Sequence, residues 1–117
     1  MQSSLGVGMN FRPQRVKKLI REELARIILR EVEFPGALVT VTDVDVDNKL
    51  ENAKVKVSVI PGEFSLKVLE LLRKEAGRLH HLLFKKINIK PMPLISFEID
   101  YGVENAARVE KRLLENQ

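Results

Sequence analysis

Residues 53–59, in the segment 53–60, alternate between apolar and polar side chains, and this pattern constrains the fold more than any other in the chain. Val55, Val57 and Val59 fall on one face of an extended strand, and the lysines and the serine between them fall on the other. A sheet that contains such a strand has one apolar face, which another layer must cover. The chain therefore needs helices or a second sheet against one side of this strand.

A second strand precedes it. Residues 38–46 are rich in β-branched side chains, but the parity of the valines changes between Val41 and Val44. One extra residue at Thr42-Asp43, forming a β-bulge, would bring the valines before and after it to the same face. Turn-forming residues 47–49 separate the two strands, so the sequence predicts a β-hairpin.

Two segments have the apolar spacing of helices. The first should begin near Pro13, which suits a first helical turn, and end before Phe34-Pro35-Gly36. The second should run from about Glu63 to about Ile87, and its first half should have an apolar side made of Leu66, Val68, Leu69 and Leu72. Alternation returns at residues 94–101, which predicts a third strand. The order of elements and the one-sided strands predict an α+β fold, with a three-stranded sheet packed on helices.

The length of 117 residues suits one domain with a single modest core. Residues 1–10 are small and uncharged and are expected to be a flexible lead-in to a domain at 11–117, which ends in a short helix from Val103 to Leu114.

No apolar run is long enough to span a membrane, and the chain has no cysteine. We expect a cytoplasmic monomer.

A glycine interrupts the second helical segment. Gly77 follows Ala76 within a run of good helix formers, where glycine costs about 1 kcal/mol relative to alanine. It predicts a bend or a break into two helices. A break would expose backbone N–H groups at the start of a second helix from Arg78, where an anion binds favourably. The alternative is a glycine tolerated where two helices cross closely.

The sequence offers little for catalysis. His80 and His81 are adjacent, so on a helix they point about 100° apart and make a poor metal pair. Asp43, Asp45 and Asp47 form a row that lacks the turn glycine and closing glutamate of a calcium loop, and a solubilising edge explains them better. No glycine-rich phosphate loop or nucleophile motif is present. We expect no enzyme, no cofactor and no metal; a metal-dependent enzyme using the aspartate row is the weakest alternative.

Charge is polarised along the chain, whose net charge is +4. Lys and Arg dominate residues 12–30 and 73–90, whereas acids dominate residues 43–51. An anionic partner such as RNA would meet a favourable and an unfavourable face. Because aromatic content is only 5%, contacts should be with phosphates rather than with stacked bases. The predicted phosphate-binding residues are Arg12, Arg15, Lys18, Arg21, Arg73, Lys74, Arg78, Lys85, Lys86 and Lys90.

Four segments carry a family resemblance: Arg12–Ile20, Val39–Val44, Leu71–Leu79 and Lys90–Asp100. Their order and spacing resemble the ribosome-binding factor A family over about residues 9–115. The resemblance implies a type II KH domain. It also implies binding to the free small (30S) ribosomal subunit and its 16S rRNA during late maturation and rRNA processing. Catalysis, a cofactor and a small-molecule substrate are not implied, and members of the family are linked to cold adaptation.

The resemblance also gives the glycine a role. Typical KH domains clamp nucleotides with a GxxG loop between two helices, and this family resembles a variant in which an alanine-x-glycine kink replaces the loop. Here the kink would be Glu75-Ala76-Gly77, with the bend expected at Ala76-Gly77. Glu75 stands where the family usually has alanine, which would put an acid beside the phosphate path. The alternative function is a protein-interaction module that uses a sheet edge or the acidic hairpin.

Overall fold

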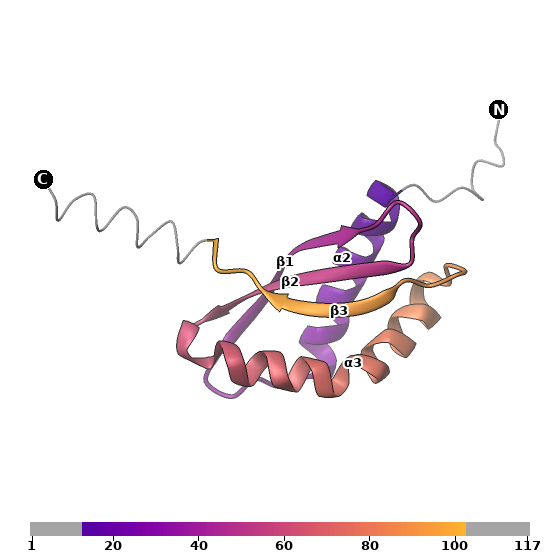
Figure 1. The fold of residues 1–117 in the computed structure, drawn as a ribbon. Helices are drawn as coiled ribbons and strands as arrows, with labels where there is room; N and C mark the ends of the chain where they lie inside the picture. The colour runs from indigo at the N-terminus through magenta and orange to yellow at the C-terminus, as the bar shows by residue number, and fades with distance from the viewer. Residues whose placement is uncertain (1–12, 103–117) are drawn as a thin grey trace, which may run out of the picture.

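The computed structural model describes residues 13–102, and the elements follow the predicted order (Figure 1). Their bounds are α2 Pro13–Glu31, β1 Leu38–Val46, β2 Asn52–Ile60, the 3-10 helix η1 Gly62–Phe64, α3 Ser65–Ile87 and β3 Leu94–Ile99. The fold class is α+β, as predicted, and within the described residues no helix has the length and apolarity that a membrane crossing requires. The lead-in at 1–10, Arg12 and the helix at 103–114 lie outside the described residues.

The three strands form one mixed sheet in the order β1-β2-β3. β1 and β2 are antiparallel, as the predicted hairpin requires, and β3 lies parallel to β2. The register of the hairpin shifts between Val41 and Asp43, which confirms the bulge. Because of that extra residue, Val44 is fully buried although its parity differs from that of Val41.

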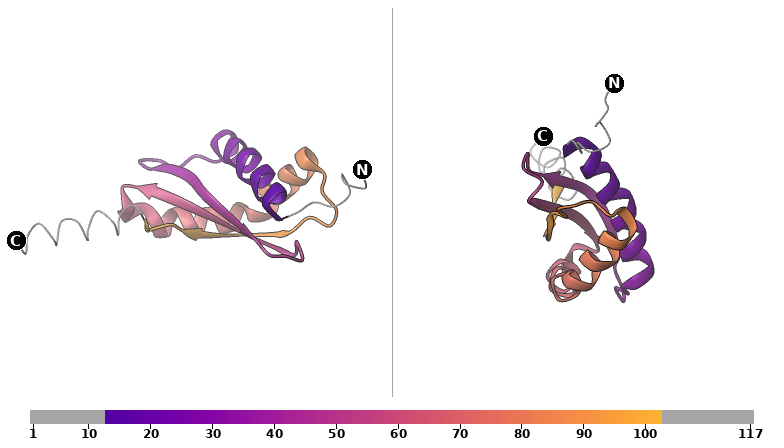
Figure 2. Two further views of the ribbon diagram at one scale, coloured as in Figure 1. Left: turned by 90° about the horizontal axis from the view of Figure 1, so that it is seen from above. Right: turned by 90° about the vertical axis from the view of Figure 1, so that its right-hand side faces the viewer.

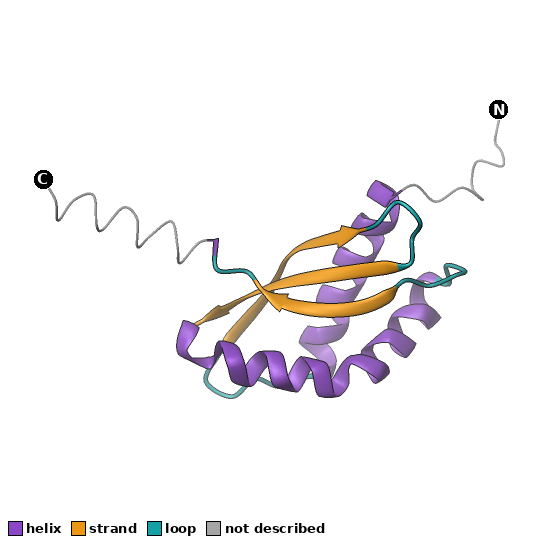
Figure 3. Ribbon diagram, viewed as in Figure 1, coloured by secondary structure: helices purple, strands orange, loops and turns teal. Residues whose placement is uncertain are grey.

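Both helices cover the same face of the sheet, which leaves the other face open (Figures 2 and 3). α2 packs over β1, α3 packs against β3 and β2, and the two helices contact each other. The core lies between these layers and contains Ile20, Leu24, Val55, Val57, Leu72, Leu79 and Leu83, all fully buried. The two-layer arrangement predicted from the strand alternation is therefore present.

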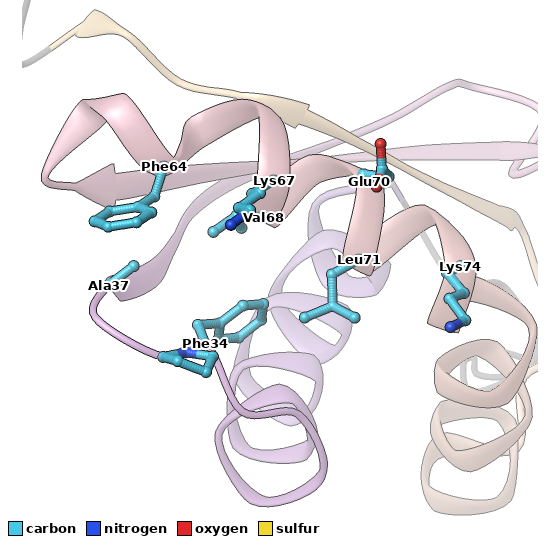
Figure 4. Close-up of a pocket in the computed structure, with 9 residues that line it drawn as sticks. Phe34, Ala37, Phe64, Lys67, Val68, Glu70, Leu71 and Lys74 are labelled. Carbon is cyan, nitrogen blue, oxygen red and sulfur yellow. The ribbon is translucent and has the colours of Figure 1, made fainter.

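α3 is a single helix that bends. Its helical hydrogen bonding is continuous from Ser65 to Ile87, and it changes direction part-way along (Figure 1). The bend follows Lys74 (Figure 4), in the stretch that contains Ala76-Gly77. The predicted bend is thus present, but the predicted break is wrong, because a continuous helix has no second N-terminus with free N–H groups at Arg78.

Packing does not require a glycine at the bend. A Cβ added to Gly77 would meet no atom within 4 Å, so the helices do not cross closely there and that alternative is also wrong. A second correction concerns Leu66, which the sequence analysis places on the apolar side of the helix and which is 76% exposed. The buried arc instead passes through Ser65, Val68 and Leu72, and Leu66 lies about 100° from Ser65 around the helix.

Candidate nucleic-acid interface

The predicted phosphate-binding residues gather on the helical layer. All of those within the described residues are exposed, and none of them lies on the open face of the sheet. Three lie on α2, five lie on α3 and one lies in the loop after α3. In that order they are Arg15, Lys18 and Arg21; Arg73, Lys74, Arg78, Lys85 and Lys86; and Lys90. The structure therefore brings two basic stretches that are far apart in sequence onto one layer.

One basic residue of α2, Arg15, lies in the first helical turn, where the helix dipole least favours a cation. The first turn of α2 contains Arg15 and no acidic residue, and Lys17 and Lys18 follow directly. The helix macrodipole makes the N-terminus partly positive, so a cation there is destabilising by typically 0.3–1 kcal/mol. Helix stability does not explain why this end of α2 is basic. An anionic partner would turn the same charges into a favourable contact.

The basic residues at the end of α3 have a structural role as well. Lys85 and Lys86 lie in its last turn, where cations interact favourably with the helix dipole. The helix ends at Asn88, which adopts the left-handed conformation with φ 46° and donates its backbone N–H to the Phe84 carbonyl at 2.8 Å. The side chains of Lys85 and Lys86 are exposed beside this cap.

Most of these cations have no acidic partner. Among the residues that the structure describes, no ion pair engages Lys18, Arg21, Arg73, Lys74, Lys85, Lys86 or Lys90. Lys17, which was not among the predicted contacts, does have one, since its Nζ lies 3.0 Å from Oδ1 of Asp43 on β1. The helical layer thus presents several cations that form no ion pair within the described part of the chain.

Arg78 is the exception on this layer. Its Nε donates to Glu75 Oε1 at 2.8 Å, and its Nη1 donates to Glu31 Oε1 at 2.8 Å. Its Nη2 donates to the backbone carbonyl of Glu31 at 3.0 Å. That carbonyl closes α2, so Arg78 caps the C-terminus of α2 from the neighbouring helix. Its guanidinium is already occupied, which separates it from the other predicted phosphate partners.

The contacts of Arg78 also explain how the negative charge of Glu75 is compensated. The hydrogen bonds that Arg78 donates to Glu75 and Glu31 raise the pKa of Arg78. The pKa of Glu31 is lowered by its hydrogen bonds with Arg30 and Arg78. Glu75 is therefore partnered by a cation within the helix, and the acid beside the predicted phosphate path is neutralised locally. Sequence reasoning missed the link between Glu31 and Arg78, because no spacing rule relates residues 47 positions apart.

The open face of the sheet is also rich in lysine, but its lysines are paired. Lys56 Nζ lies 3.3 Å from Asp45 Oδ2 and 4.0 Å from Glu98 Oε1. Lys54 Nζ lies 3.7 Å from Glu98 Oε2. Asp45, and Glu98 to a lesser degree, raise the pKa of Lys56. This face is therefore a network of opposite charges and offers an anion little net attraction.

The aspartate row is used by the fold. Asp43 pairs with Lys17, and Asp45 pairs with Lys56. Asp47 closes the hairpin turn, because its Oδ1 accepts the Glu51 backbone N–H at 2.7 Å. Within residues 13–102, no group of three acidic or histidine side chains is arranged to hold a metal ion.

Comparison with known proteins agrees with this geometry. The sequence profile of the family described as ribosome-binding factor A matches residues 12–113. The chain belongs to the ribosome-binding factor A family. Ribosome-binding factor A of Caldanaerobacter subterraneus is 32% identical over 110 residues, which cover 92% of this chain and 90% of that protein. Ribosome-binding factor A of Halothermothrix orenii is 38% identical over 104 residues, which cover 87% of this chain and 85% of that protein.

Solved structures of the family share the fold. The crystal structure of ribosome-binding factor A from Thermus thermophilus matches with a TM-score of 0.66 at 22% identity, covering 74% of this chain and 94% of that one. A second match is a homology model of Thermus thermophilus ribosome-binding factor A, as fitted into a cryo-EM map of its complex with the 30S subunit. This match has a TM-score of 0.61 at 20% identity and covers 72% of this chain and 90% of that one.

Proposed function

We propose that this chain binds the small (30S) ribosomal subunit through its 16S rRNA and assists late maturation and rRNA processing. It acts in the cytoplasm as a monomer and without catalysing a reaction. Membership of the ribosome-binding factor A family and the 30S complex of the Thermus thermophilus protein support this proposal. The observation that carries it is the layer of exposed cations on α2 and α3 that have no acidic partner in the described part of the chain.

The contact is mainly with phosphates. Lys18 and Arg21 on α2 and the cations of α3 reach the RNA backbone, and the bend in α3 sets the angle between the two halves of that helix. We exclude Arg78 from the direct contacts, since its donors are already bound to Glu75 and Glu31. Arg15 in the first turn of α2 and Arg12, which precedes that helix in the sequence, are further proposed phosphate contacts.

Co-sedimentation with purified small subunits at several salt concentrations tests the proposal. If phosphates dominate, the logarithm of the association constant falls linearly with the logarithm of salt concentration, by roughly 0.7–0.9 per phosphate neutralised. A protein that fails to co-sediment at low salt refutes the proposal. Replacing Lys85 and Lys86 together by Glu should weaken binding, and an unchanged affinity would remove both from the contacts.

The maturation role is tested separately, by depleting the protein in its own host. We expect precursor 16S rRNA with unprocessed ends to accumulate, and primer extension would detect it. Complementation should restore processing with the wild-type chain and fail with the Lys85→Glu/Lys86→Glu variant. Normal 16S ends after full depletion would contradict the maturation role but leave subunit binding intact.

A protein-interaction module is the alternative from another class of function. The acidic hairpin gives it limited support, because Asp43 and Asp47 are engaged within the fold. Competition distinguishes the two functions: purified 16S rRNA should displace the protein from subunits if RNA is the partner. If excess RNA leaves the complex intact, the contact is with a ribosomal protein.

A further inference from the structure

A hollow between the first half of α3 and the loop after α2 brings two aromatic rings together (Figure 4). Its volume is about 350 Å³, and its lining includes Phe34, Phe64, Val68 and Leu71. Pockets that hold small organic groups run from about 300 to 1,000 Å³, so this one suits a group the size of a nucleobase. The rings come from positions 30 residues apart, and the low aromatic content of 5% gave no indication that two of them meet.

The local backbone holds both rings in place. The Phe34 carbonyl accepts the Ala37 N–H at 3.0 Å, which closes a turn through Pro35 and Gly36. Gly36 has a φ of +81°, a conformation that favours glycine. A Cβ at Gly36 would lie 3.5 Å from Cζ of Phe64, so the Phe64 ring packs directly against this turn. Both rings are half-buried, which leaves part of each available to the hollow.

Two lysines flank the hollow. Lys67 and Lys74 line it, lie two helical turns apart on α3 and are exposed. Neither forms an ion pair with another described residue. The one acid in the lining, Glu70, directs its carboxylate away from Phe34 and Leu71 (Figure 4). Lys74 also belongs to the predicted phosphate-binding residues, so the hollow continues the basic surface of α3.

We propose that this hollow receives one unpaired base of an RNA strand. The base stacks on Phe34 or Phe64, and the phosphates on either side of it contact Lys67 and Lys74. An aromatic surface between unpaired cations suits this occupant, because a nucleotide supplies both a π-face and a negative charge. An apolar peptide segment would fill the hollow but would leave both lysines without a partner. The inference rests on the proposed function and revises the expectation that contacts are confined to phosphates.

The test compares an unstructured RNA heptamer with an abasic strand of the same length and charge, by fluorescence anisotropy. Since base stacking on an aromatic side chain is worth about 1–3 kcal/mol, the wild-type protein should bind the intact strand about tenfold more tightly. In Phe34→Leu or Phe64→Leu, an apolar side chain remains but the ring is lost. The ratio of the affinity for the intact strand to the affinity for the abasic strand should then fall toward one. Leu66→Ala, on the exposed side of the same helix, is the matched control and should keep the wild-type ratio.

A Phe64→Tyr variant, which keeps the ring, should retain the ratio, and circular dichroism would verify that each variant is folded. If a leucine variant does not fold, NMR of the wild-type protein decides, since stacking should shift the Phe34 or Phe64 ring protons only with the intact strand. Equal affinity for the two strands overturns the proposal.

The outcomes also separate this proposal from the proposed function. If the protein co-sediments with small subunits but does not distinguish the intact from the abasic strand, the base-binding hollow fails and the proposed function stands. If the protein distinguishes the strands but does not co-sediment, the proposed function fails and the hollow stands. If Phe34→Leu weakens subunit binding while the ring protons do not respond to RNA, the hollow contacts a ribosomal protein and our proposal is wrong.

Discussion

The helical layer and the open face of the sheet both carry lysines, yet within residues 13–102 most lysines of the helical layer have no ion-pair partner, whereas Lys54 and Lys56 on the sheet are paired. On the sheet, Lys54 and Lys56 lie between Asp45 of β1 and Glu98 of β3. On the helices, Lys18 and Lys85 have no acidic partner among the described residues. The difference shows that a count of basic residues does not locate an anion-binding surface, because the neighbouring elements decide which charges remain available.

The cause is geometric. A central strand has a neighbour on each side at about 4.8 Å, so every outward side chain of β2 faces side chains of β1 and β3. The outward face of a helix has only its own side chains nearby, three or four residues away. Lys85 and Lys86 therefore stay unpaired unless an acid occurs at those spacings. Lys56, in contrast, lies opposite Glu98 on β3 and diagonally across from Asp45 on β1.

The most direct way to break this comparison is to remove the same charge from each surface. Lys85→Gln/Lys86→Gln should weaken small-subunit binding by about tenfold or more at low salt and reduce the salt slope by about 2. Lys54→Gln/Lys56→Gln removes equal charge from the sheet and should change neither quantity. Co-sedimentation across a salt series measures both, and equal losses in the two variants would show that net charge alone matters.

Gly77 tests whether the shape of the helical layer contributes beyond its charge. Gly77→Ala should raise the stability of the fold by roughly 0.4–1 kcal/mol, because the position is open and alanine favours the helix. At the upper end this is a rise in Tm of about 4–8 °C, measurable by thermal unfolding.

The same variant should bind subunits less tightly if the bend positions α3, with an unchanged salt slope because no charge is lost. A lower Tm would mean that the backbone at Gly77 is strained in a way that its open surroundings do not indicate.

Two arginines on α3 sharpen the contrast between engaged and available cations. Arg78→Ala removes the donors that bind Glu31 and Glu75, so it should lower Tm by a few degrees at most and leave the salt slope unchanged. Arg73→Ala is the matched variant, since Arg73 is exposed and unpaired in the described part of the chain; it should leave Tm unchanged and reduce the slope by about 1. If Arg78→Ala instead reduces the salt slope and Arg73→Ala does not, Arg78 is a phosphate contact and Arg73 is not.

The smallest effect is expected at a side-chain hydrogen bond that links Thr42 of β1 to Asp100, the residue directly after β3. Thr42 Oγ1 donates to Asp100 Oδ2 at 2.7 Å, and with the Gly102 N–H it holds the pKa of Asp100 below its ordinary value of 3.8. This contact stabilises the fold above pH 3.8, and the stabilisation is lost as the pH falls through the lowered pKa. In Thr42→Val the pKa of Asp100 should rise toward 3.8.

NMR titration of the Asp100 carboxyl measures this change. Thr40→Val, at an exposed threonine on the same strand, is the control and should leave the Asp100 pKa unchanged. An unchanged pKa in Thr42→Val would show that the hydroxyl does not stabilise the charged carboxylate.

Local rules account for what could be predicted. Pro13 and the Phe34-Pro35-Gly36 stop bounded α2, and the change of valine parity located the bulge near Asp43, because capping and strand alternation are properties of neighbouring residues. The bend near Gly77 was predicted for the same reason. The break was not found, because helical hydrogen bonding continues through a single glycine at a cost of only about 1 kcal/mol.

The sequence by itself determined the order of the elements, the face that each strand buries and the two basic stretches. Tertiary structure alone decided which charges are available, since Arg78 is engaged by Glu31 and Lys17 by Asp43, whereas Lys18 and Lys85 have no ion-pair partner among the described residues. It also decided that Phe34 and Phe64 share one hollow. Periodicity is fixed by the geometry of one helix or strand, whereas a pair or a pocket depends on how separate elements pack, which no local spacing encodes.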